Sequence, residues 1–205
     1  MANYIFNDIL QKASEKNISA TSAQSRTWFR NQAARISSAD PSKMIKSDQA
    51  LLVKKPILGN MYLFQYDPKH KATLPYYDRF PLIFPFKSAN VTGPASNGRE
   101  FMGINMHYLP LVLRAKLMDA LYQVSSNPKN DEITKMRLSY RILTSTSKIS
   151  YYEPCIKKYL IGHVRTQFFE IPSSQWNMAL FLPLERFVGA TNQQVWKESK
   201  RIIGA

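Results

Sequence analysis

The 205-residue sequence predicts an α+β fold: a small antiparallel β-sheet or partial barrel wrapped by helices, with a helical N-terminal arm. Two observations predict this fold. Segments in the middle of the chain alternate apolar and aromatic residues between proline- and glycine-containing breaks, which is typical of antiparallel strands. The two ends of the chain carry apolar residues at helical spacing instead. We therefore divide the chain into an arm, residues 1–50, and a core domain, residues 51–205.

The arm is expected to form two short amphipathic helices, followed by a polar break at Pro41. Short amphipathic helices bury themselves poorly and need a partner surface, either their own domain or a neighbouring protein. Tryptophan, tyrosine and arginine are typical anchors of protein interfaces. The candidate partner-binding residues of the arm are therefore Tyr4, Trp28, Phe29 and Arg30, and packing of the arm on its own domain is the alternative.

Three strands are expected in the middle of the chain, over residues 60–66, 81–86 and 99–109. The first has Met61 and Leu63 on one face and Tyr62 and Phe64 on the other, so it is expected to be covered on both sides. The second contains Pro85, which lacks a backbone N–H and restricts the strand to a sheet edge or to bulged pairing. Residues 88–98 are expected to form a loop.

Helical spacing returns after Pro110. Residues 109–124 have a leucine stripe, with Arg114 placed off that stripe. Four further helices are expected: at 132–143, within 151–171, from Gln175 onward after capping serines, and at the C-terminus with Thr191 or Asn192 as its N-cap.

The chain is strongly basic, with 28 lysines and arginines against 14 acidic residues and a formal net charge of +14. Residues 1–98 and 99–205 share this excess equally, so it comes from folded surfaces rather than from a tail. Such a charge favours nucleic acid or the acidic face of a protein as partner. No apolar run is long enough for a bilayer, and the N-terminus does not read as a signal peptide. The single cysteine, Cys155, fits a reducing compartment and is expected to be a buried, inert thiol.

No motif for a metal, a nucleotide cofactor or a small-molecule substrate is present, since the three histidines are scattered and the glycines form no phosphate-binding loop. Asp67, His70 and Asp78 supply groups capable of acid–base chemistry. The simpler interpretation is that Asp67 opens an Asp-Pro turn, His70 lies on a solvated turn, and Asp78 caps the backbone or pairs with Arg79 or a nearby lysine. We therefore expect no catalytic residues and no enzymatic activity.

Residues 66–86 combine prolines, aromatic rings and lysines without a glycine. Cations that meet phosphates and rings that stack on bases are typical of single-strand binders. This pattern offers a candidate nucleic-acid site at Lys69, Lys71, Tyr76, Tyr77 and Arg79. The alternatives are that the rings anchor an irregular loop on the core, or that the segment meets a protein partner.

Three long segments have an unusual combination of motifs: YDPKHKATLPYYDRFPLIFPF, FMGINMHYLPLVLRAKLMDALY and CIKKYLIGHVRTQFFEIPSSQWNMALFLPLERF. Over residues 59–188 the chain resembles a family of virion proteins from T4-like tailed phages. The resemblance implies a non-enzymatic structural component of the virion in the tail, baseplate or neck, assembled in the host cytoplasm. Its partners would be other virion subunits. The alternative is a basic DNA-binding protein that completes the head or protects DNA ends.

Overall fold

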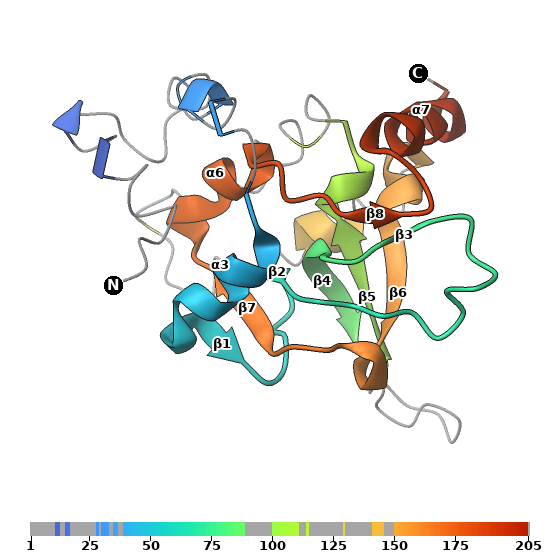
Figure 1. Ribbon diagram of the computed structural model, residues 1–205, viewed down its shortest axis with the longest axis horizontal. Helices are drawn as coiled ribbons and strands as arrows, with labels where there is room; N and C mark the ends of the chain where they lie inside the picture. The colour runs from blue at the N-terminus through green and yellow to red at the C-terminus, as the bar shows by residue number, and fades with distance from the viewer. Residues whose placement is uncertain are drawn as a thin grey trace.

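The structure is a computed structural model that describes residues 39–88, 100–110 and 150–204, together with residues 11–12, 15–16, 28, 30–32, 35–36, 114, 129 and 141–145. Six of its strands form one sheet in the spatial order β1-β7-β2-β4-β5-β6, and every neighbouring pair is antiparallel (Figure 1). Their bounds are β1 Leu52–Val53, β2 Met61–Leu63, β4 Leu82–Ser88, β5 Glu100–Asn105, β6 Ile156–Leu160 and β7 Phe168–Ile171. The predicted α+β class is confirmed, and the sheet is open rather than closed into a barrel.

A separate two-stranded ribbon joins β3 (Tyr77–Asp78) to β8 (Phe187–Val188). It closes the long loop that follows β2, and Gly189, at the end of β8, lies against the backbone of Pro75. Gly189 has φ +90°, a conformation that favours glycine, and a Cβ there would lie 2.6 Å from the Pro75 carbonyl oxygen. The ribbon therefore places the end of the 67–76 loop against the C-terminal part of the chain.

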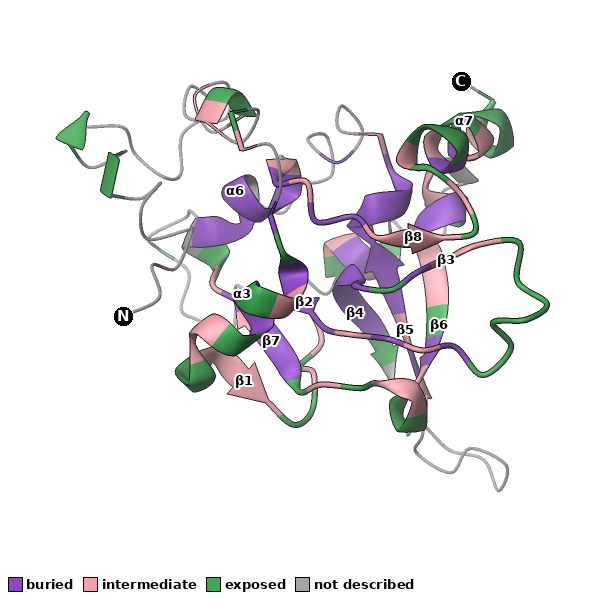
Figure 2. Cartoon of the chain, in the orientation of Figure 1, coloured by how far each residue is buried: buried purple, intermediate pink, exposed green. Residues whose placement is uncertain are grey.

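Strand β2 is buried on both faces, as the pattern at residues 60–66 predicted. Met61 and Leu63 belong to the main core, while Tyr62 and Phe64 belong to a second, largely aromatic cluster. Successive side chains of a strand point to opposite faces, so both faces of β2 are covered. Figure 2 shows β2, β4 and β5 as a buried centre, with exposed residues concentrated in the loop after β2 and in the outer helices.

Pro85 in β4 is accompanied by a bulge in the pairing of β4 with β5. β4 lies between β2 and β5, and its pairing with β5 shifts register between Pro85 and Lys87. Because Pro85 has no N–H to donate, a bulge at this point avoids an unpaired ladder position. The expected bulged pairing is confirmed, and the alternative of an edge strand is wrong.

The described α-helices are α3 (Pro41–Ser47), α6 (Trp176–Phe181) and α7 (Asn192–Ile203). Short 3-10 helices span Gln49–Leu51, Met106–Tyr108, Ser150–Cys155, Ile161–His163 and Ser173–Gln175. Thr191, one of the two N-caps that the sequence offered, is the N-cap of α7 and forms a capping box with Gln194. Asp40 caps α3, so Pro41 begins a helix where a break was expected.

The helix expected within residues 151–171 is wrong. The 3-10 helix Ser150–Cys155 leads into β6, which pairs with β5 so that Tyr159 lies opposite Phe101. Apolar residues at helical spacing in a short run do not distinguish a helix from a buried strand. Here, pairing with a strand more than 50 residues earlier decides the conformation.

Several predictions lie wholly or mostly outside the described residues: the helices at 109–124 and 132–143, the loop at 88–98, and the positions of Tyr4 and Phe29. Trp28 is half-buried against the main core, and Arg30 is exposed. Ala39, Met44 and Ile45 also belong to the main core. The division into an arm and a core domain stays a prediction.

Candidate nucleic-acid interface

A pocket of about 530 Å³ opens beside the loop that joins β2 to β3. We call it the tyrosine–lysine pocket. The segment from Tyr66 to Asp78 lines one side, and β5, β6 and the 3-10 helix at 106–108 line the other. Its aromatic and basic lining residues are Tyr66, Lys69, His70, Tyr76, Tyr77, Tyr108, Lys157, Lys158 and Tyr159. This arrangement combines the two residue types that bind nucleotides by stacking and by charge.

Contacts among rings hold the walls of the pocket in place. The ring of Tyr76 lies 6.0 Å from that of Tyr108, and Tyr108 lies 5.1 Å from Phe187 on β8. The ring of Tyr66 meets that of Tyr159 edge-on at 5.0 Å, and its hydroxyl accepts a hydrogen bond from the Leu160 N–H at 3.1 Å. Tyr76 is half-buried and packed against other rings, so it anchors the loop on the core, as one of the alternatives for this segment predicted.

The loop itself is held by polar contacts at its base. The Asp67 carboxylate accepts from Lys71 Nζ and from the Arg165 guanidinium, each at 2.9 Å. Hydrogen bonds from Lys71 and Arg165 hold the pKa of Asp67 below its ordinary value. The His70 carbonyl accepts from the backbone N–H of Thr73 at 3.0 Å. These contacts order the turn that presents Lys69 and His70, which are both exposed.

The cations of the pocket differ in how they are neutralised. Lys158 forms an ion pair with Glu100 at 3.3 Å. The ammonium of Lys157 lies 4.1 Å from the centre of the Tyr108 ring, and within the described part of the chain it has no ion pair with a carboxylate. Burial lowers the pKa of Lys157, an effect that Cys155 opposes. Lys157 is thus a half-buried cation whose one described partner is an aromatic face.

The predicted nucleic-acid site is brought together only in part. Lys69, Tyr76 and Tyr77 line the pocket. Lys71 is instead paired with Asp67, and Arg79 is exposed outside the lining, where its backbone N–H donates to the Arg186 carbonyl.

The sequence interpretation missed the second half of the pocket, Lys157 and Lys158. It did so because residues 151–171 were assigned to a helix. Two adjacent lysines within the strand-like segment Ile156–Leu160 are the signal that would have found them.

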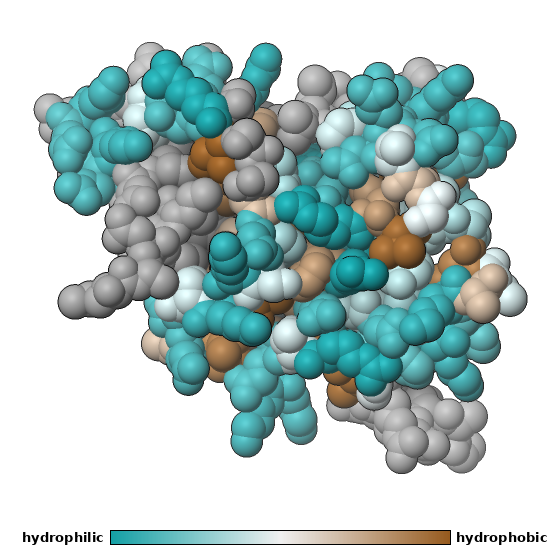
Figure 3. Space-filling view, viewed as in Figure 1, coloured by the Kyte–Doolittle hydropathy of each residue, from teal (hydrophilic) through white to brown (hydrophobic). Residues whose placement is uncertain are grey.

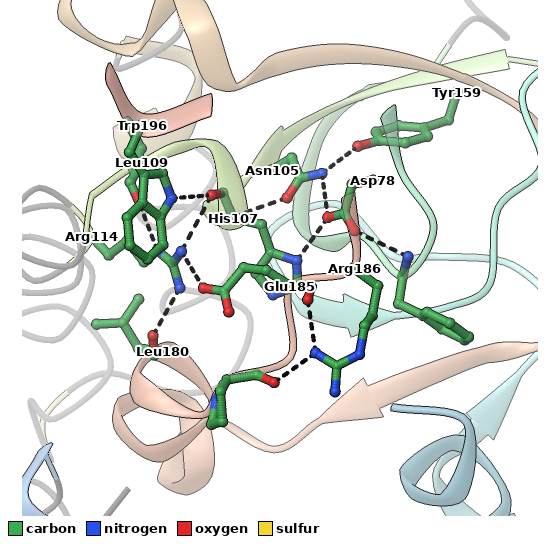
Figure 4. A network of polar contacts seen from close by, with 12 residues as sticks. Asp78, Asn105, His107, Leu109, Arg114, Tyr159, Leu180, Glu185, Arg186 and Trp196 are labelled. Carbon is green, nitrogen blue, oxygen red and sulfur yellow. Dashed lines mark hydrogen bonds and ion pairs between the residues drawn. The ribbon is translucent and has the colours of Figure 1, made fainter. Parts of the chain in front are cut away.

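The floor of the pocket is a buried polar network built around Asp78 (Figure 4). Its carboxylate accepts from Asn105 Nδ2 at 3.1 Å and from the Phe80 N–H at 3.0 Å, and it lies 2.7 Å from His107 Nδ1. Desolvation pushes the pKa of Asp78 upward, but the interactions with His107, together with the hydrogen bonds from Asn105 and Phe80, outweigh it and hold the pKa below its ordinary value. An ionised carboxylate carries no proton, so His107 Nδ1 is the donor. The hydrogen bond from the Phe80 N–H confirms that Asp78 caps the backbone. The alternative, an ion pair between Asp78 and Arg79, is wrong.

A second buried network lies next to the first and centres on Arg114 (Figure 4). The guanidinium is fully buried, forms an ion pair with Glu185 and donates to the backbone carbonyls of His107, Leu109 and Leu180. Burial pushes the pKa of Glu185 upward, but the interactions with Arg114 and His107, together with a backbone hydrogen bond, lower it by more. Arg114 was expected on the polar side of its helix; it is instead among the largest fully buried side chains of the described residues. The first network supplies Asp78 and Asn105 to the lining of the pocket, and the second contacts the first through His107.

The residues considered for acid–base chemistry have separate structural partners. Asp67 pairs with Lys71 and Arg165, Asp78 lies in the floor network, and His70 is exposed on the turn. Among the described residues, no cluster of three histidine, cysteine or acidic side chains is suited to holding a metal ion. The geometry supports binding by stacking and charge.

The visible outer surface is largely hydrophilic (Figure 3). In Figure 3, hydrophilic side chains dominate the visible face, and hydrophobic ones form small, separate spots. Within the described ranges, no helix combines the length and apolar character needed to cross a bilayer.

Comparison with known proteins identifies the family. The family model described as phage T4 terminal DNA protecting protein matches residues 1–200. A search of curated proteins and a search of solved structures each found no match. The match confirms the resemblance to proteins of T4-like phages, and its description agrees with the DNA-end-protecting alternative rather than with a tail, baseplate or neck subunit. With nearly its whole length matched, the chain belongs to the phage T4 terminal DNA protecting protein family.

Proposed function

We propose that this protein binds the ends of linear DNA and shields them from nucleases, without catalysing a reaction of its own. The observation that supports this function is the tyrosine–lysine pocket, where rings and cations from segments about 90 residues apart converge. The family description and the net charge of +14 also support binding to DNA ends. The protein would act with the phage genome in the virion, after assembly in the host cytoplasm.

Charge and stacking have separate tasks in this proposal. The basic surface attracts any DNA, because neutralising phosphates releases counterions and needs no particular sequence. Stacking on a tyrosine ring requires an unstacked base face, which a duplex offers at its ends. A basic protein with an aromatic pocket therefore gains affinity at an end beyond what it has along the duplex. Covering that end blocks an exonuclease sterically.

The experiment is an exonuclease-protection assay on linear duplex DNA with the full chain. Wild-type protein is expected to slow digestion, and the variant Lys69→Gln/Lys157→Gln is expected to protect less. The salt dependence of binding should also become shallower, by about one unit of logarithmic slope for each lysine that contacts a phosphate.

The matched control is Lys43→Gln/Lys46→Gln. It removes the same charge from exposed positions on α3, an element that contributes no residue to the pocket lining. Covalently closed circular DNA is the substrate control, and it should bind more weakly than linear DNA at equal length. Equal protection by both double variants would contradict the assignment of the pocket. Failure of the wild type to protect any linear DNA would contradict the proposed function.

A further inference from the structure

The tyrosine–lysine pocket has the size of a site for a single nucleotide. A volume of about 530 Å³ is within the range of sites that enclose one small ligand, roughly 300–1,000 Å³. A single nucleotide fits such a space, whereas a stacked, paired duplex does not enter it. The half-buried rings of Tyr76 and Tyr77 offer flat apolar surfaces for a base on the loop side of the pocket.

The second observation is the state of Lys157. The cationic neighbours Lys71 and Lys158 are paired with carboxylates, and within the described residues Lys157 is not. A partly desolvated ammonium that contacts only an aromatic ring has lost part of its hydration without gaining an anionic partner. Binding an anion would therefore stabilise it. An anionic ligand group beside Lys157 would supply that partner.

We infer that the pocket receives a nucleoside 5′-monophosphate as the terminal nucleotide of a DNA strand, and that Lys157 binds its 5′-phosphate. This inference rests on the proposed function. A terminal phosphate monoester carries a charge of about −1.5 to −2 at neutral pH, and a second ionisation near pH 6 distinguishes it from the singly charged diesters of the strand interior. Lys69, exposed at the rim, is placed to meet the next phosphate. Glu100, the acidic residue at the rim, is neutralised by Lys158.

The test measures the affinity of the full chain for a DNA hairpin with a single blunt end, labelled in its loop. One hairpin carries a 5′-phosphate and the other a 5′-hydroxyl at that end. Wild-type protein is expected to bind the phosphorylated hairpin about tenfold more tightly, as is typical of a charge-assisted contact. Lys157→Gln should bind both hairpins equally, and Lys157→Arg, which keeps the charge, should retain part of the preference. Lys43→Gln should behave as the wild type does.

Free thymidine 5′-monophosphate and thymidine are the second pair of ligands, titrated into the wild-type protein and followed by NMR. The monophosphate should perturb resonances of the pocket and compete with the phosphorylated hairpin, and thymidine should do so far more weakly. This measurement uses no variant, so it tests the inference even where Lys157→Gln fails to fold.

Two outcomes overturn the inference. If wild-type protein binds the two hairpins equally while still protecting DNA ends from exonuclease, the 5′-phosphate site is wrong and the proposed function stands. If Lys157→Gln is folded and keeps the wild-type preference, Lys157 is not the phosphate contact. Binding of the free monophosphate without any affinity for the hairpin ends would uphold the pocket chemistry and contradict end protection.

Discussion

His107 Nδ1 and the Asp78 carboxylate lie 2.7 Å apart in the interior, with both side chains almost completely buried. Asp78 ends β3 and lines the tyrosine–lysine pocket, and His107 belongs to the 3-10 helix after β5, between the lining residues Asn105 and Tyr108. Asn105 joins them, since its Nδ2 donates to Asp78 and its Oδ1 accepts from the backbone N–H of His107. The pair therefore connects the loop that carries Tyr76 and Tyr77 to the sheet that carries Lys157.

Replacing Asp78 by alanine is expected to lower the free energy of unfolding by roughly 3–5 kcal/mol, because donors from His107, Asn105 and Phe80 would lose a buried acceptor. Urea denaturation followed by circular dichroism measures this loss. The control is Asp67→Ala, which removes a partly exposed carboxylate paired at the surface and should cost much less. A similar loss in both variants would show that the buried network is not specially stabilising.

Stability is expected to fall on acidification, with a contribution from Asp78 and Glu185. Both pKa values are lower in the folded protein than their ordinary values of 3.8 and 4.5. A lowered folded pKa stabilises the protein above the unfolded pKa, and this contribution disappears as the pH falls through the folded pKa. The loss should therefore begin near pH 4.5 and continue below pH 3.8.

Urea midpoints measured from pH 7 to pH 3 follow this effect. The variant Asp78→Asn/Glu185→Gln should have lower stability at pH 7 and a flatter pH dependence below pH 5. Identical pH profiles for the variant and the wild type would rule out these carboxylates as the source of the slope.

Arg114 and Glu185 are expected to be energetically coupled. Arg114→Met leaves the Glu185 carboxylate buried without its cation, at a cost of roughly 3–5 kcal/mol. Arg114→Met/Glu185→Leu removes both charges, so its loss should be smaller than the sum of the two single losses. A double-mutant cycle in urea measures the coupling, and strict additivity would count against the ion pair. The double variant stays less stable than the wild type, since three backbone carbonyls lose a donor.

Gly189→Ala is expected to destabilise the protein by roughly 1–3 kcal/mol, because a Cβ at φ +90° would be strained and would clash with the Pro75 carbonyl. Relief of the clash would shift Tyr76, so affinity for DNA ends should fall as well. Thermal unfolding and the hairpin titration measure the two effects. Gly162→Ala is the control, since a Cβ there meets nothing within 4 Å. Wild-type behaviour of Gly189→Ala would show that the loop tolerates a wider β8 turn.

Cys155 is expected to be inert toward thiol reagents in the native protein. Its side chain is completely buried, and burial raises the pKa of the thiol to about 12, so almost no thiolate exists at neutral pH. Ellman's reagent should react with it only after denaturation. Rapid labelling under native conditions would mean that the region around β6 opens readily.

Local patterns predicted the elements that local physics determines. The alternation at Met61 and Tyr62 placed β2 between two apolar layers, and Thr191 identified the start of α7. Pro85 limited its strand to an edge or to bulged pairing, because the missing N–H is a property of that residue alone, and the structure has the bulge. The same reasoning failed at Ile156–Leu160, where a short apolar run is compatible with helix and strand.

The sequence itself determined four features: the basic charge, the phage-type motifs, the two apolar faces of β2 and the N-cap of α7. Each depends on composition or on residues a few positions apart. Tertiary structure alone decided that Arg114 is buried, that Asp78 meets His107, and that Lys157 lines the same pocket as Tyr76 and Tyr77. These contacts join residues 29 to about 90 positions apart. Strand pairing and the satisfaction of buried charges select such contacts for the chain as a whole, so no local pattern encodes them.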